Sequence, residues 1–61
     1  MNQVHPIGTL VKHRYSLDDD DLYGIIIGHD DSATLNLVRW LKYNQTDYLY
    51  NSAIIVIVEN K

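Results

Sequence analysis

Ile54-Ile55-Val56-Ile57-Val58 is the stretch of sequence that decides the fold class of this chain. Its residues are all β-branched, which favours extended backbone. Because a strand sends successive side chains to opposite faces, Ile54, Val56 and Val58 share one face, and Ile55 and Ile57 share the other. Such a strand is apolar on both sides, and an apolar row outside the core usually marks an interface. The alternative is a cover formed by an acidic loop upstream or by the N-terminal segment.

Three further segments have the character of strands. Residues 9–15 alternate in chemistry, which is typical of a strand with one solvent-exposed face. Residues 23–28 contain three consecutive isoleucines with glycines on either side, as at the bends of small barrels. Residues 48–50 form a short strand after a polar turn predicted at residues 44–47. A helical half-turn is expected at residues 51–52, before the last strand.

Residues 35–42 fit two patterns. As a strand, they place Val38 and Trp40 on one face and Arg39 on the other. As a helix at about residues 33–43, they would be capped by Ser32 and would present an apolar stripe. The neighbouring strand signals favour the first interpretation. The expected fold class is therefore all-β with five strands, and the alternative is an α+β fold with that helix.

Composition limits both the size and the chemistry of the protein. Sixty-one residues form one domain, and the chain has no cysteine for a disulfide or a thiolate zinc site. The net charge is −3, and residues 16–31 contain six aspartates but no lysine or arginine. An acidic chain is atypical of general nucleic-acid binding, which usually requires a basic face.

The order of these segments resembles an SH3-like barrel. Residues 7–14, Ile-Gly-Thr-Leu-Val-Lys-His-Arg, resemble the "G-x-L-V-basic" opening of very small SH3-like proteins of tailed bacteriophages, including those of cyanobacteria. A glycine and β-branched strand at residues 23–28, a strand ending in Trp at residues 37–40 and a last apolar strand at residues 54–59 extend the resemblance. It covers nearly the whole chain and implies a single SH3-like domain at residues 1–61.

The chain also departs from that pattern. Residues 41–44 replace the Asp-Gly turn that often follows the Trp, and the acidic, Tyr-rich motif of peptide-binding SH3 domains is missing. The second departure argues against recognition of proline-rich peptides. Members of this group are mostly without assigned activity. The resemblance therefore implies a fold and a viral setting, in the host cytoplasm or in the virion.

Metal binding and catalysis have little support in the sequence. Asp18-Asp19-Asp20-Asp21 lacks the alternate spacing and the glycine turn of calcium loops, and it reads as a solvated loop or an acidic docking surface. His5, His13 and His29 have no spacing typical of zinc ligands. With no nucleophile motif or phosphate loop either, we expect a protein that is not an enzyme and has no cofactor.

The leading hypothesis is a non-enzymatic phage accessory protein that acts as a protein–protein interaction module. It would be a minor virion component or a host-directed factor, and its partner a phage or host protein or a second copy of the chain. Trp40 is expected in the core, whereas the tyrosines fit either the core or a binding surface. The residues predicted to bind the partner are Tyr43, Tyr48, Tyr50, Ile55, Ile57, Asp19 and Asp20.

A small nucleic-acid-binding regulator is the alternative hypothesis. Lys12 and Arg14 share one face of the first predicted strand, and Arg39 would have to join them to form a basic patch. Such a patch beside an exposed tyrosine would suit single-stranded nucleic acid. No apolar run approaches the ~18 residues needed to span a bilayer, so no membrane partner is expected.

Overall fold

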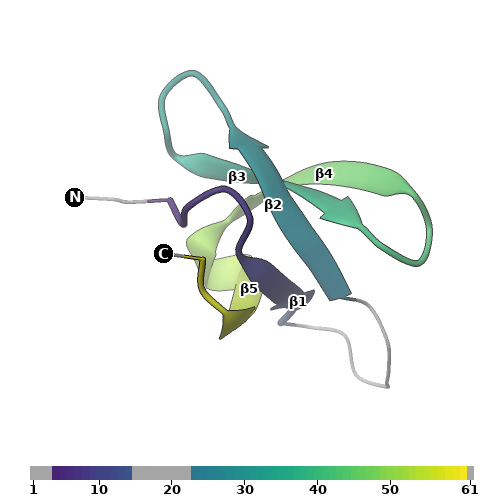
Figure 1. Ribbon diagram of the computed structural model, residues 1–61. Coiled ribbons are helices and arrows are strands. Elements are labelled where there is room, and N and C mark those ends of the chain that lie inside the picture. The colour runs from purple at the N-terminus through teal and green to yellow at the C-terminus, as the bar shows by residue number, and fades with distance from the viewer. Residues whose placement is uncertain (1–3, 15–22, 61) are drawn as a thin grey trace.

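The chain folds into one antiparallel sheet of five strands, with strand order β4-β3-β2-β1-β5. The computed structural model describes residues 4–14 and 23–60 (Figure 1). Its elements are β1 (Leu10–His13), β2 (Tyr23–His29), β3 (Leu35–Trp40), β4 (Gln45–Tyr50), the short 3₁₀-helix η1 (Asn51–Ala53) and β5 (Ile54–Val58). The predicted all-β fold class is confirmed, and η1 stands where the half-turn was expected.

The segment that fitted two patterns is a strand, so the alternative helix at residues 33–43 is wrong. β3 pairs with β2 on one side and with β4 on the other. Burial alternates along it, because Asn36, Val38 and Trp40 are buried while Arg39 is exposed. A helix would have directed Leu41 toward the core as well, yet Leu41 lies in the following turn and is 56% exposed.

The predicted turn at residues 44–47 is also wrong, because β4 already begins at Gln45. The chain reverses instead at residues 41–44, where the backbone N–H of Asn44 donates to the carbonyl of Trp40 at 3.0 Å. Asn44 has a φ of 53°, a left-handed conformation that asparagine tolerates better than most residues. The first residues of β4 are polar because they belong to an exposed edge strand. Their composition is also typical of a turn, which explains the wrong prediction.

The core is small and draws on four of the strands. It consists of Val11 from β1, Ile26 from β2, Val38 and Trp40 from β3 and Ile54 from β5. Leu49 of β4 and Val56 of β5 are partly buried and pack against this cluster. The expected core position of Trp40 is confirmed, since only 6% of it is exposed. Each strand therefore directs at least one apolar side chain to the same interior.

The sheet is open between its two outer strands. β4 and β5 are at opposite ends of the hydrogen-bonded order, so the ladder does not close into a barrel. Two irregularities bend the sheet. The register shifts between Ile26 and Gly28 in the β2–β3 pair and between Leu10 and Val11 in the β1–β5 pair. Such bulges increase strand twist, which matches the strong coiling of the ribbon in Figure 1.

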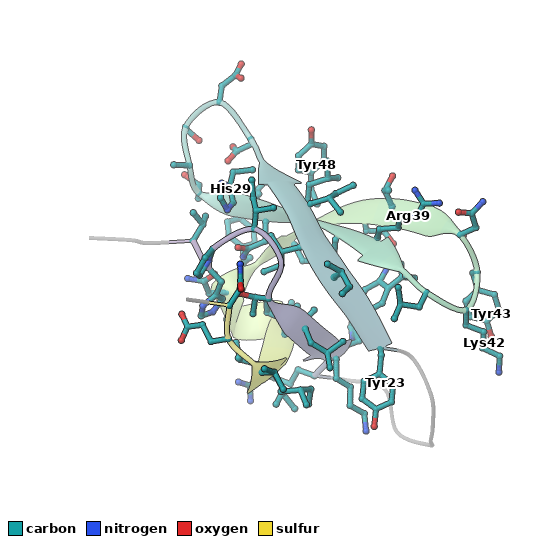
Figure 2. All side chains as sticks on the ribbon, in the orientation of Figure 1. Tyr23, His29, Arg39, Lys42, Tyr43 and Tyr48 are labelled. Carbon is teal, nitrogen blue, oxygen red and sulfur yellow. The ribbon has the colours of Figure 1, made fainter. Side chains whose placement is uncertain are left out.

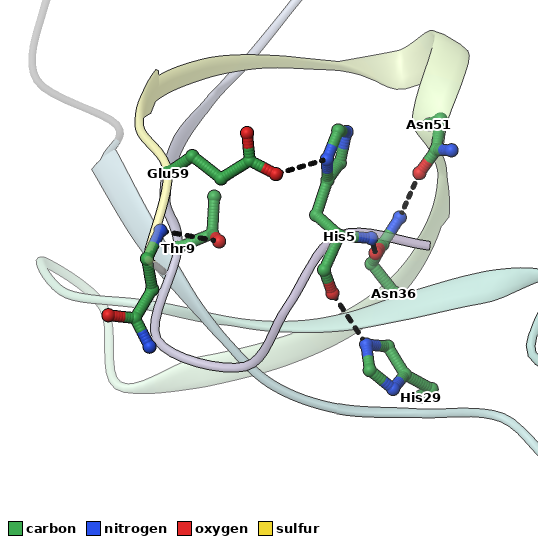
Figure 3. A network of polar contacts seen from close by, with 7 residues as sticks. His5, Thr9, His29, Asn36, Asn51 and Glu59 are labelled. Atoms are coloured by element: carbon green, nitrogen blue, oxygen red, sulfur yellow. Dashed lines mark hydrogen bonds and ion pairs between the residues drawn. The ribbon is translucent and has the colours of Figure 1, made fainter. Parts of the chain in front are cut away.

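A polar network fastens the N-terminal segment to the sheet (Figure 3). Asn36 is fully buried, and its Oδ1 accepts the backbone N–H of His5 at 2.9 Å. Its Nδ2 donates to Oδ1 of Asn51 at 2.7 Å and to the carbonyl of Leu49 at 3.2 Å. The ring of His29 bonds the carbonyl of His5 at 2.7 Å. Because one buried amide joins three segments, we expect it to set how the chain enters β1.

Candidate interaction surfaces

The last strand, β5, has three exposed apolar side chains on its outer side. The exposed fractions are 41% for Ile55, 44% for Ile57 and 59% for Val58, and these three residues are here called the β5 surface. Exposure of Ile55 and Ile57 was expected from strand alternation. Exposure of Val58 was not, because alternation groups it with the buried Ile54. The register shift explains the difference, since Val58 pairs with Leu10 and Ile57 is left as the extra residue.

β5 is also an edge strand. Within the described residues it pairs along one side only, with β1. Edge strands of natural proteins are usually protected by charged side chains or proline, and β5 contains neither. The opposite edge, β4, contains Asp47 and several polar residues. Of the two edges, β5 is therefore the one better suited to accept another strand.

The described part of the N-terminal segment, residues 4–9, leaves the β5 surface exposed. Gly8 donates its backbone N–H to the carbonyl of Ile26 at 2.7 Å, and the N–H of Ile26 donates to Thr9 at 3.0 Å. The segment therefore extends the pairing of β1 with β2. It contacts the end of the chain through Asn60, which donates from Nδ2 to the carbonyl of Ile7 at 2.8 Å, and through the ion pair of His5 with Glu59. The acidic loop, the other predicted cover, lies outside the described residues together with Asp19 and Asp20.

The three predicted tyrosines are exposed, but they do not form one groove. Tyr48 and Tyr50 share a face of β4 and pair with Leu37 and Leu35. Tyr43 lies in the β3–β4 turn, at the tip of the hairpin and well away from Tyr48 in Figure 2. Tyr48 and Tyr50 belong to one edge strand, β4, whereas the β5 surface belongs to the other. The structure thus separates the predicted partner-binding residues into distinct surfaces.

The three predicted phosphate-binding cations are also dispersed. The Nζ atom of Lys12 lies 5.8 Å from the ring centroid of Tyr23 on β2. Arg14 follows β1 and donates from Nε to the carbonyl of Ser52 in η1 at 2.8 Å. Arg39 is on β3 and donates from Nη2 to Oδ1 of Asn44. No described contact joins these cations into one patch, and nucleic-acid binding stays a prediction.

One pocket brings together residues that the sequence did not group. His13 from the end of β1, Trp40, Tyr43, Gln45 and Asp47 surround an open cavity of about 240 Å³, here called the hairpin pocket. The indole Nε1 of Trp40 donates to Oδ2 of Asp47 at 2.8 Å. The rings of His13 and Trp40 have centroids 6.0 Å apart, tilted by 42°. The predicted turn at residues 44–47 includes Asp47. In β4, alternation places Asp47 on the same face as Gln45 and Leu49, and Leu49 packs against the core.

The β2–β3 turn holds the most strongly perturbed carboxyl group among the described residues. Oδ1 of Asp30 accepts the backbone N–H groups of Leu35 and Thr34, each at 2.8 Å. Oδ2 accepts the hydroxyl of Ser32 at 2.8 Å. The bond from Leu35, followed by that from Ser32, favours the carboxylate and lowers the pKa of Asp30 from 3.8 to about 2. These contacts close the turn and indicate a structural role.

Two further observations concern other kinds of site. Among residues 4–14 and 23–60, no three His, Asp or Glu side chains are grouped so that they could hold a metal ion. In the same part of the chain, no helix has the length and hydropathy required to cross a bilayer.

Compared with known proteins, the chain matches no family model, no curated protein and no solved structure.

Proposed function

We propose that this protein is a non-enzymatic protein–protein interaction module that associates through β5, in the first instance with a second copy of itself. The observation that supports this most directly is the combination of a free strand edge with the exposed β5 surface. Apolar side chains on an unpaired edge favour strand addition, in which main-chain hydrogen bonds give affinity and burial of side chains adds to it.

Self-association is favoured by the composition of β5. The strand has no charge, so two copies can lie side by side without placing like charges opposite each other. Isoleucine and valine on both copies would then leave water together, at ~25 cal/mol for each Å² of apolar surface. Pairing of two identical edge strands about a two-fold axis also gives a closed dimer, and two-fold symmetry is the commonest among soluble oligomers.

The finer architecture that we propose is an SH3-like barrel opened between β4 and β5. Five short strands, a long connection after β1 and the short η1 before β5 support it. Leu49 and Val56 support it as well, because they come from the two edge strands and pack against the same core. The setting that we propose, an accessory protein of a tailed phage acting in the virion or the host cytoplasm, is supported by the sequence motifs at residues 7–14, 23–28, 37–40 and 54–59.

Sedimentation velocity across the micromolar range tests the proposal. The natural chain should sediment faster as its concentration rises, and Ile55→Glu and Ile57→Glu should each sediment as monomers at every concentration. Leu41→Glu is the matched control, because Leu41 is 56% exposed but lies in the β3–β4 turn. Circular dichroism should show that all three variants remain folded. A natural chain that stays monomeric, with both glutamate variants folded and no more soluble than it, would contradict the proposal.

A further inference from the structure

We propose that the hairpin pocket binds the side chain of an arginine supplied by a protein partner. The inference rests on the proposed function in so far as it names the chemistry of a partner. It concerns a different place on the molecule, however, because Trp40 and Asp47 lie on the core side of β3 and β4 whereas the β5 surface faces outward. The two proposals can therefore fail separately.

The walls of the pocket combine the groups that recognise an organic cation. Trp40 and Tyr43 contribute aromatic rings, and Asp47 contributes a carboxylate. The hydrogen bond from Trp40 Nε1 fixes Oδ2 of Asp47 beside the indole. A carboxylate has about four acceptor positions, so this bond leaves most of them for a ligand. A cation in the pocket would lie beside the small exposed part of Trp40, of which 6% is exposed, and next to the exposed ring of Tyr43 and a negative charge.

The charges around the pocket also favour a cation. The ion pair found between described residues joins His5 and Glu59 at 3.9 Å and does not involve Asp47. The chain as a whole has a net charge of −3, which attracts basic partners. One positive group lies close by: the Nζ atom of Lys42 is 5.7 Å from the ring centroid of Tyr43. A ligand that stacked on Tyr43 would therefore have to displace this ammonium group, or bind in the part of the pocket nearer Asp47.

Size and shape favour arginine over other cations. A cavity of about 240 Å³ is below the ~300 Å³ at which pockets for whole small molecules begin, so it suits one side chain. A guanidinium group is planar, stacks on aromatic rings and pairs with a carboxylate through two parallel N–H groups. It is also less strongly hydrated than an ammonium group, which lowers the cost of entering a half-open site. Gln45, which also lines the cavity, has a side-chain carbonyl that can accept a hydrogen bond from a guanidinium group.

Trp40 is the only tryptophan of the chain, so its fluorescence reports on the pocket directly. The probe is N-acetyl-argininamide, titrated at low ionic strength. The uncharged N-acetyl-citrullinamide is the control, because it has the same length and a similar planar end group. We expect a saturable fluorescence change with the arginine probe, with affinity in the millimolar range because a single side chain must be ordered in an open site. The citrulline probe should give no saturable change.

Variants assign the signal to the pocket. Asp47→Asn keeps an oxygen to accept the indole N–H but removes the charge, and it should weaken arginine binding by about tenfold, since a charge-assisted hydrogen bond is lost. Tyr50→Ala should bind as the natural chain does, because Tyr50 lies on the opposite face of β4. Equal responses to the two probes, no saturable response to either, or unchanged affinity in Asp47→Asn would overturn the proposal. Arginine binding by a monomeric chain would support the pocket and contradict self-association through β5; self-association without arginine binding would do the reverse.

Discussion

The indole nitrogen of Trp40 and a carboxylate oxygen of Asp47 are 2.8 Å apart, joined by a hydrogen bond between neighbouring strands. Trp40 is the largest side chain of the core, and this bond satisfies its one polar group. The same bond positions the carboxylate that gives the hairpin pocket its charge. Stability and the proposed recognition thus depend on the same pair of residues, and substitutions of Asp47 can separate them.

We predict that Asp47→Ala lowers the free energy of unfolding by about 1–2 kcal/mol, because the buried indole N–H loses its acceptor. Asp47→Asn should cost less, since the amide oxygen replaces the carboxylate oxygen. Urea unfolding followed by Trp40 fluorescence measures both values. Equal losses for the two variants would mean that the charge of Asp47, rather than the hydrogen bond, stabilises the fold.

Gly24 allows close contact between β2 and the core side chains of β3. A Cβ atom there would lie 2.5 Å from Cγ1 of Val38 and 2.8 Å from Cε3 of Trp40. We predict that Gly24→Ala destabilises the protein by about 1–3 kcal/mol through overpacking. Gly28 on the same strand is the matched control, because its added Cβ would meet nothing closer than 3.7 Å. Thermal unfolding should show a clear fall in Tm for Gly24→Ala and little change for Gly28→Ala; similar Tm values for both would contradict this account of the core.

Asp30 predicts a specific dependence of stability on pH. The hydrogen bonds from Leu35 and Ser32 lower its pKa in the folded state. Ionisation of Asp30 therefore stabilises the folded protein relative to the unfolded chain. That contribution is fully present above pH 3.8 and is lost as the pH falls toward about 2. Urea unfolding at several pH values should show a smaller loss over this interval in Asp30→Asn, which is already less stable near neutral pH. Asp31→Asn, in the same turn, should retain the dependence of the natural chain; if Asp30→Asn retains it too, other carboxyl groups are responsible.

Asn36 should be the most sensitive polar residue of the sheet. We predict that Asn36→Ala lowers the free energy of unfolding by about 1–3 kcal/mol, because the backbone N–H of His5 and the oxygens of Leu49 and Asn51 lose a buried partner. Asn36→Asp should be worse, since it turns a donor into an acceptor that faces two other acceptors. Hydrogen exchange of the His5 amide measures the local effect. Full protection of that amide in Asn36→Ala would show that the N-terminal segment is held by other contacts.

The strands that the sequence predicts best are those rich in β-branched residues. β5 is found at its predicted bounds, and β2 differs from its prediction by a single residue, His29. β4 was predicted too short because edge strands tolerate polar side chains, and its first residues look like a turn when taken alone. The position of the β3–β4 turn depends on Asn44, which adopts a left-handed conformation. Because several polar residues follow one another here, the composition does not show which of them adopts it.

Exposure on β5 could be predicted only as far as simple alternation holds. Ile55 and Ile57 follow it, whereas Val58 does not, because the bulge depends on how β1 and β5 meet across the whole chain. The hairpin pocket was not predictable for a similar reason. It requires the end of β1 to approach a hairpin about thirty residues away, and such long-range packing leaves no local periodicity in the sequence.

Amide hydrogen exchange of β5 at low and at high protein concentration tests the central claim most directly. The account predicts that amides of β5 that do not bond to β1 exchange freely in dilute solution and become protected as concentration rises. The amides of β4, the other edge, should stay unchanged over the same range. Ile57→Glu should abolish the effect without altering the rest of the sheet. Exchange from β5 that is independent of concentration, in a chain whose core amides are protected, would contradict association through this strand.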